Sequence, residues 1–245
     1  MRHIVAIAVL LMLFFAGTYV FLMSCSWFNL KEIEISGDTG LTLEEVTRLS
    51  PVLLGTNIFA LDTRTIENDL KRESRLSEVK VIRELPDKIN IRLLRKRPIL
   101  LINLDRLYGL TKNKEIIPLQ GLNQEVDLPI LSGISVNRID FYRETDIPEL
   151  RKALDFYQTV LALDSTFLGK ISELDLSLAG NLVLYLLPSG LRVVMGAGEY
   201  QPRLARLMEV LKMEPDLEKL SLIDLRFENQ AIVKNRKLQV KEHES

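Results

Sequence analysis

Few residues of this 245-residue chain could carry out catalysis, and they stand far apart. Its two histidines are His3, ahead of a long apolar run, and His243, close to the last residue. Histidine is the usual general base and a common zinc ligand, so this placement argues against Ser-His-Asp or Cys-His catalysis and against a clustered histidine metal site. A single cysteine, Cys25, also excludes a disulfide framework.

Two further motifs have simple structural interpretations. Gly196-Ala197-Gly198 lacks the third glycine and the Lys-Ser/Thr pair of a phosphate-binding loop, so we interpret it as a turn from a strand to a helix. The carboxylates of Glu44 with Glu45, and of Asp216 with Glu218, fall at predicted helix ends, where they favour the helix dipole or meet solvent. We therefore expect no enzymatic activity, no cofactor and no metal ion.

The element that must position everything else is an uncharged apolar run at residues 4–23. A helix of that length rises about 30 Å, which matches the hydrocarbon core of a bilayer. We expect a transmembrane helix at residues 4–24, a cytoplasmic tail at residues 1–3 and an extracytoplasmic body. The run is longer than the core of a cleaved signal peptide and lacks a small-x-small cleavage site, so we expect it to be retained. Leu22-Met23-Ser24-Cys25 also resembles a lipoprotein box, and this alternative stays open.

Residues 28–97 predict a small module with the order strand, helix, helix, strand, strand. Isoleucine and glutamate alternate in residues 32–35, as in a half-buried strand. Thr42 and Glu45 have the spacing of a capping box, and Asp62 can cap a second helix. Two strands with alternating apolar and polar residues complete the module.

Lysines and arginines gather in the last two strands of this module and just beyond them, between Lys80 and Arg97. They alternate with apolar residues, so we interpret them as the solvated face of a sheet, although a patch for anionic lipid or nucleic acid is the functional alternative. Nucleic acid is disfavoured because the cluster has no interleaved aromatic residues and the net charge of the chain is only -1.

Residues 98–235 predict a mixed, mainly antiparallel β-domain with two helices, and residues 236–245 a C-terminal tail. Pro148 and Pro202 stand at or near the expected helix starts. The expected strands are residues 99–102, 107–110, 115–117, 174–178, 182–187, 191–195, 220–227 and 231–234. The predicted fold class is therefore α+β, with one transmembrane helix ahead of two folded regions.

Several segments resemble a known bacterial family. Residues 33–37, 54–59 and 79–89 look like a POTRA module, and residues 171–177, 190–196 and 223–227 are similar to the β-domain of the cell division family FtsQ, called DivIB in Gram-positive bacteria. Arg95 and Leu100 depart from the family pattern, which usually has glutamate and a small residue there. With a single span ahead of both regions, the resemblance covers nearly the whole chain.

The resemblance implies a divisome scaffold at the septum of the inner membrane. Such a scaffold binds small bitopic division proteins of the FtsB and FtsL type by strand addition, and so influences septal peptidoglycan synthesis. In this family the end of the β-domain receives them, which on this chain points to Phe227, Asn229, Gln230, Ala231, Ile232, Val233 and Lys234. A last strand at a sheet edge exposes unpaired backbone groups for such addition.

Other interpretations stay open. Phe227 and Val233 can belong to the core, and the POTRA module can be a second docking surface for other divisome membrane proteins. POTRA modules also occur in envelope assembly and transport factors, usually in series ahead of a membrane barrel. A lipoprotein of envelope transport is a further alternative, and lipidation of Cys25 would change the intact mass by removing residues 1–24 and adding acyl chains.

Overall fold

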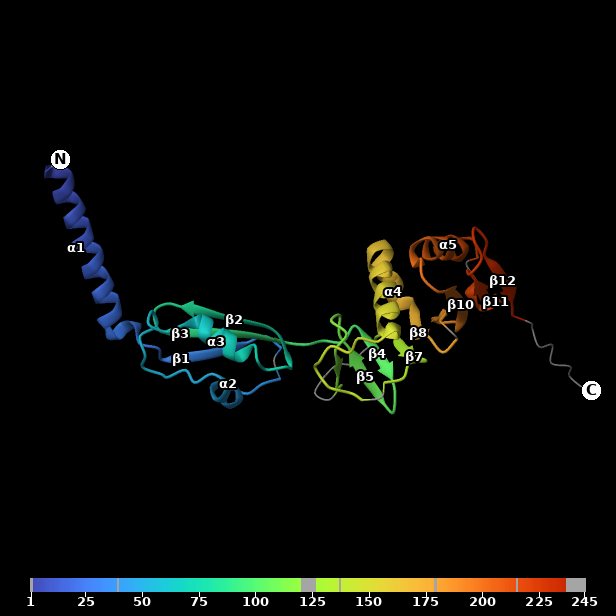
Figure 1. Cartoon of the computed structure of the whole chain (residues 1–245), viewed down its shortest axis with the longest axis horizontal. Coiled ribbons are helices and arrows are strands. Elements are labelled where there is room, and N and C mark those ends of the chain that lie inside the picture. Colours follow the sequence, from blue (N-terminus) through green and yellow to red (C-terminus); the bar gives the residue numbers. More distant parts are fainter. Residues whose placement is uncertain are drawn as a thin grey trace, which may run out of the picture. The chain divides into compact units, whose positions relative to one another are not determined.

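The computed structural model describes residues 2–38, 40–119, 127–136, 138–178, 180–214 and 216–236. The chain divides into two compact units, residues 1–96 and residues 97–245. The predicted α+β class is confirmed, with an apolar N-terminal helix, a POTRA-like module and a large mixed sheet with helices (Figure 1). Of the predicted tail at residues 236–245, only Arg236 lies within the described residues.

The first unit begins with α1 (Arg2–Ser24), a helix that is long and apolar enough to cross a membrane. None of its residues is buried against the rest of the protein. Its 23 residues span about 35 Å, which exceeds a hydrocarbon core of about 30 Å. An isolated helix that is apolar on all sides is suited to solvation by lipid rather than by water.

The rest of the first unit has the predicted element order. A short 3-10 turn, η1 (Ser26–Phe28), leads to β1 (Glu32–Ser36), α2 (Leu43–Leu49), α3 (Thr63–Leu70), β2 (Leu76–Glu84) and β3 (Lys88–Arg95). β3 lies in the centre of the sheet, parallel to β1 and antiparallel to β2. Its alternate residues Ile89, Ile91 and Leu93 are fully buried in the core of this unit. Lys80 and Arg92 are exposed between buried neighbours, as a solvated face requires.

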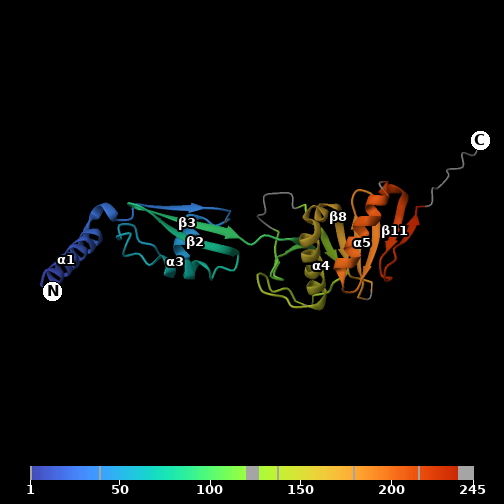
Figure 2. The same cartoon turned by 90° about the horizontal axis from the view of Figure 1, so that it is seen from above.

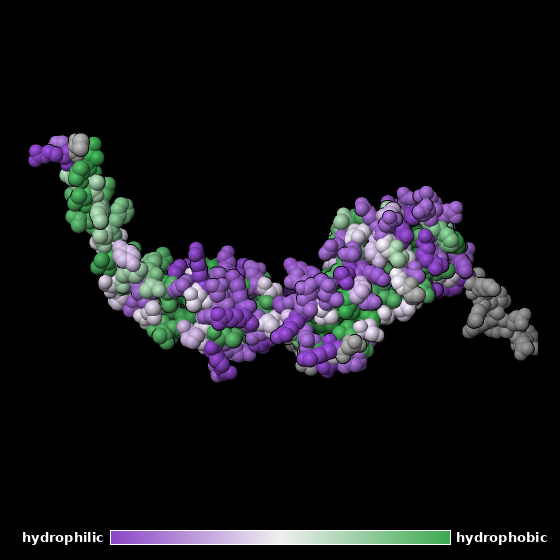
Figure 3. Space-filling model, in the orientation of Figure 1, coloured by the Kyte–Doolittle hydropathy of each residue, from purple (hydrophilic) through white to green (hydrophobic). Residues whose placement is uncertain are grey.

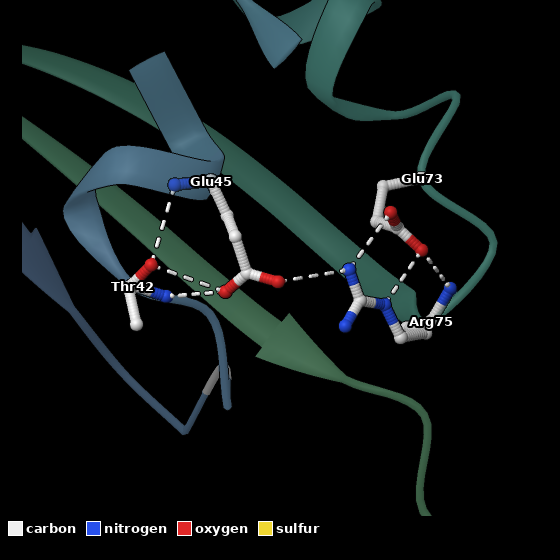
Figure 4. A network of polar contacts seen from close by, with 4 residues as sticks. All are labelled: Thr42, Glu45, Glu73 and Arg75. Carbon is white, nitrogen blue, oxygen red and sulfur yellow. Dashed lines mark hydrogen bonds and ion pairs between the residues drawn. The ribbon is translucent and has the colours of Figure 1, made fainter. Parts of the chain in front are cut away.

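Both predicted helix caps are present. The backbone N–H of Thr42 donates to the Glu45 carboxylate at 2.9 Å, and the N–H of Glu45 donates to the Thr42 hydroxyl at 3.3 Å. Figure 4 shows Arg75 between Glu45 and Glu73, at 3.6 and 2.9 Å. The backbone hydrogen bond from Thr42 lowers the pKa of Glu45. Asp62 accepts from two backbone N–H groups at the start of α3.

The second unit is built on one nine-stranded sheet with the order β12-β11-β10-β9-β8-β7-β4-β5-β6. Its elements are β4 (Leu100–Asn103), β5 (Leu107–Leu110), β6 (Ile116–Ile117), β7 (Ile130–Ser132), α4 (Pro148–Asp164), η2 (Ser165–Lys170), β8 (Ile171–Asp175), β9 (Leu182–Leu186), β10 (Leu191–Gly196), α5 (Tyr200–Met213), η3 (Leu217–Lys219), β11 (Leu220–Asp224) and β12 (Ile232–Asn235). β7 pairs in parallel with β4 and β8, and β10 pairs in parallel with β11.

The two helices of this unit cover one face of the sheet (Figures 1 and 2). Phe156 of α4 and Tyr200 of α5 meet edge to face, with ring centroids 5.5 Å apart. Leu150 and Leu204 are fully buried between helices and sheet. The sequence pattern does not predict β7, because a strand of three residues is too short to show an alternating pattern.

Replacing Ile91 by alanine should destabilise the first unit by about 2–5 kcal/mol, because Ile91 is 0% exposed and the change leaves a cavity. The matched variant Ile82→Ala, at a position 40% exposed on β2, should cost less than about 1 kcal/mol. Hydrogen exchange of the β3 amides in the detergent-solubilised chain measures the opening of this unit. Equal acceleration by both substitutions would contradict the placement of the core.

Candidate functional site at a sheet edge

β12 lies at one edge of the nine-stranded sheet. Within the described residues its strand neighbour is β11, which it joins in an antiparallel pair with Ile232 opposite Asp224 and Val233 opposite Ile223. All four residues of β12 are exposed. An edge strand presents one row of backbone N–H and C=O groups away from its sheet, and another strand can bind to that row.

The register shows which backbone groups of β12 face outward. The N–H of Arg236 donates to the Lys219 carbonyl at 2.7 Å and therefore points toward β11. Because the direction of the N–H groups alternates along a strand, the even-numbered residues of β12 also face β11. Val233 then directs its N–H and C=O outward, as does the N–H of Asn235, whereas the Asn235 carbonyl accepts from the Ser221 hydroxyl at 3.3 Å. The irregularity in this pairing lies in β11, so the alternation along β12 is unbroken.

The opposite edge of the sheet is covered by the chain itself. The Tyr142 N–H donates to the Ile116 carbonyl at 3.0 Å, and the Thr145 N–H donates to the Lys114 carbonyl at 2.9 Å. The Lys114 ammonium also lies 2.5 Å from the Glu144 carboxylate. The segment before α4 therefore occupies the outer side of β6, whereas no described segment occupies the outer side of β12.

A side chain of α5 holds the turn between β11 and β12. One guanidinium nitrogen of Arg206 donates to the Phe227 carbonyl at 2.7 Å and to the Gln230 carbonyl at 3.0 Å. Between them Asn229 has a positive φ of 55°, in the left-handed region that asparagine tolerates better than most residues. The orientation of the final hairpin is thus coupled to a helix on the covered face of the sheet.

An ion pair stands where β11 ends. The Arg226 guanidinium donates to the Asp224 carboxylate through two nitrogens, at 3.0 and 2.6 Å. Asp224 is buried, and its charge is therefore matched by a forked partner. The hydrogen bond from Arg226 lowers the pKa of Asp224, and the same contact raises the pKa of Arg226.

The seven residues singled out from the sequence all lie in this hairpin: Phe227, Asn229, Gln230, Ala231, Ile232, Val233 and Lys234. Phe227 and Val233 are 48% and 40% exposed, so the alternative that they belong to the core is wrong. Ala231 is partly buried against the core of the unit. The Lys234 carbonyl accepts a hydrogen bond from the Ser221 hydroxyl. Sequence reasoning missed Arg206, which offered no signal beyond its place on an amphipathic helix.

The glycine motif forms the predicted turn from a strand to a helix, between β10 and α5. Arg203 donates to the carbonyls of Met195, Ala197 and Gly198 at 2.8–2.9 Å, which fixes the path of the turn. Within the described residues, no group of three or more His, Cys, Asp or Glu side chains is placed to hold a metal ion. His243 lies outside the described residues.

Replacing Arg206 by methionine should raise hydrogen exchange at the β12 amides several-fold, because the turn loses its contact with α5. The matched variant Arg203→Met removes an arginine of the same helix that holds a different turn, and should leave β12 protected. Mass-spectrometric hydrogen exchange on both variants makes the comparison. Unchanged exchange at β12 in the Arg206 variant would show that the turn keeps its conformation without Arg206.

Replacing Asp224 by asparagine should lower the stability of the second unit by about 1–2 kcal/mol at neutral pH, less than for a fully buried pair because Arg226 is half exposed. Because the pKa of Asp224 is lower in the folded state, its ionised carboxylate stabilises the fold. This contribution is fully present at pH values above the unfolded-state pKa of about 3.9, and it is lost as the pH falls through the folded-state pKa. The difference between wild type and variant should therefore shrink in acid. Thermal unfolding as a function of pH measures it, and a constant difference would contradict the ion pair as its cause.

Comparison with known proteins places both folded regions in one family. Residues 28–94 match the model for the POTRA domain of FtsQ type, and residues 101–226 match the model for the C-terminal region of the cell division protein FtsQ/DivIB. Proteins described as cell division protein FtsQ from Geotalea daltonii and Syntrophotalea carbinolica are each 26% identical, over 89% and 86% of this chain and 80% and 73% of their own lengths.

A protein of the same description from Streptomyces coelicolor is also 26% identical, over 88% of this chain and 83% of its own length. Each of the three similarities therefore covers more than four fifths of this chain. The matched models and these relatives show that the chain belongs to the FtsQ/DivIB family of cell division proteins.

Proposed function

We propose that this protein is a non-enzymatic divisome scaffold at the septum, and that it binds bitopic division proteins of the FtsB and FtsL type by strand addition to β12. The observation that carries the proposal is the outward row of backbone groups on β12, at a sheet edge that no other described segment covers. The opposite edge of the same sheet is closed by residues 142–145.

Strand addition at this edge uses two kinds of contact. The N–H and C=O of Val233 and the N–H of Asn235 supply main-chain hydrogen bonds, each with a net contribution of about 1 kcal/mol. Ile232 and Val233 point to opposite faces of the strand and are 41% and 40% exposed, so an added strand gains apolar contact on both faces. Phe227, 48% exposed at the adjoining turn, provides an aromatic anchor of the kind that dominates interfaces.

The membrane helix supplies the location. We propose that residues 1–3 lie in the cytoplasm and that α1 anchors the protein in the inner membrane, with residues 28–97 and 98–235 as extracytoplasmic domains. Bitopic partners present their own extracytoplasmic segments on the same side. Through these partners the scaffold influences septal peptidoglycan synthesis without taking part in the reaction.

The POTRA-like module offers a second docking surface in this proposal. Within the described residues β1 pairs with β3 alone, so its outer edge is also available to other divisome membrane proteins. The outer edge of β2 differs, because the Val81 N–H already donates to the Glu67 carboxylate at 2.9 Å.

Replacing Val233 by proline should weaken capture of an FtsB/FtsL-type partner by at least about tenfold, since proline removes an outward N–H donor from the edge. The variant Val233→Thr keeps this donor and the branched shape, so most of the affinity should remain. A pull-down with the full detergent-solubilised chain, followed by titration, measures both affinities.

Because proline can disturb the hairpin itself, the hydrogen exchange of β10 and β11 is compared in both variants. The Ile232→Pro variant serves as a further control. The backbone N–H of Ile232 faces β11, so removing this donor should open the hairpin. Full partner capture by a folded Val233→Pro protein would rule out strand addition at β12.

A further inference from the structure

Four large apolar side chains are exposed at one end of the first unit, and the divisome role does not use them. They are Trp27, Leu53, Leu54 and Leu85, with exposed fractions of 68%, 71%, 63% and 61%. We call them the helix-proximal patch. Burying two adjacent leucines in the core is normally favourable, so their exposure on a folded module with a complete core indicates a surface that something else covers.

Backbone hydrogen bonds hold the Leu53-Leu54 loop beside the segment that leaves α1. The Gly55 N–H donates to the Leu30 carbonyl at 2.8 Å, and the Leu30 N–H donates to the Thr56 carbonyl at 2.9 Å. The Ile58 N–H donates to the Phe28 carbonyl at 2.8 Å in the same ladder. The two leucines are therefore fixed next to residues that directly follow the membrane helix.

The same loop also contacts the end of α1 itself. The side-chain amide of Asn57 donates to the carbonyls of Leu22 and Met23, at 2.8 and 3.1 Å. These belong to the last turn of α1, where carbonyls have no partner within the helix. Asn57 thus acts as a cap supplied by the module, and it sets the depth of the loop relative to the helix end.

Leu85 lies at the same end of the unit. It lies in the turn between β2 and β3, where the Asp87 carbonyl accepts from the Lys31 N–H at 2.8 Å. Figure 3 shows the hydrophobic surface of α1 and further hydrophobic surface on the adjoining end of the module. The patch therefore lies at the end of the module that adjoins α1.

We propose that the helix-proximal patch lies in the headgroup region of the bilayer leaflet from which α1 emerges, so that the lipid surface is its partner. α1 spans about 35 Å against a hydrocarbon core of about 30 Å, which places its last turn among the headgroups. Tryptophan favours this region, and the leucines next to it bury apolar surface there. The inference holds for either orientation of α1 and does not depend on partner binding at β12.

The test uses the full chain with Cys25, its only cysteine, replaced by serine. Single cysteines at Leu54 or Leu85 are spin-labelled, and the chain is reconstituted in phosphatidylcholine–phosphatidylglycerol vesicles. The matched control is Leu43, 50% exposed at the start of α2 and separated from the helix-proximal end by the length of β1. Collision rates with oxygen, which concentrates in lipid, and with a water-soluble nickel complex report the depth of each label.

Labels at Leu54 and Leu85 should collide with the nickel complex several-fold less often, and with oxygen more often, than the label at Leu43. Equal nickel collision rates at all three positions would overturn the proposal and leave the patch to a protein partner. The protection of these labels from the nickel complex could also disappear when the protein is diluted into more lipid. That result would overturn the proposal, because a second copy of the chain would then be what covers the patch.

A measurement on the unlabelled chain guards against disturbance by the labels. Trp27 is the only tryptophan, so its fluorescence reports one site. Brominated lipids should quench it most strongly when the bromine lies close to the headgroup. Emission typical of water without quenching would contradict the proposed depth.

Discussion

The pairing of backbone N–H and C=O groups is the constraint on which this structure depends. An open sheet necessarily has two edges, and each edge carries groups that must find a partner in the protein, in water or in another chain. In the nine-stranded sheet the segment around Thr145 closes the edge at β6, and β12 carries the other. Within the part of the chain that the structure describes, one edge is therefore covered and the other is not, and this asymmetry is the physical basis of the proposed scaffold role.

The interior of the second unit serves to hold that edge in a defined position. α4 and α5 cover one face of the sheet, and Arg206 of α5 ties the turn before β12 to the helix layer. Asp224 and Arg226 form a forked ion pair at the end of β11. An edge strand on a short hairpin is otherwise a weakly held element, so these contacts preorganise it, and preorganisation lowers the entropy cost of binding.

The same constraint appears at the junction with the membrane. The final carbonyls of α1 have no partner within the helix, and the Asn57 amide of the module supplies one. The loop that carries Asn57 also carries the exposed Leu53 and Leu54. The hydrogen bonds of Asn57 therefore join the end of the helix to the loop and to its apolar surface. Anchor and folded module are thereby joined by hydrogen bonds, which is the basis of the proposed contact with lipid beyond the span itself.

Much of this protein was determined by local sequence patterns. Unbroken apolarity set the length of α1, the Thr42–Glu45 spacing set a helix start, and alternation along β3 set which residues are buried. The family resemblance also came from sequence, through short motifs in a fixed order, and the two family models match. The seven hairpin residues followed from that resemblance. Tertiary structure alone decided that β12 is an edge, that residues 142–145 close the opposite edge, and that β7 exists at all. Strand order and side-chain braces such as Arg206 join residues far apart in the chain, and no local pattern of apolar and polar residues encodes which distant segments will meet.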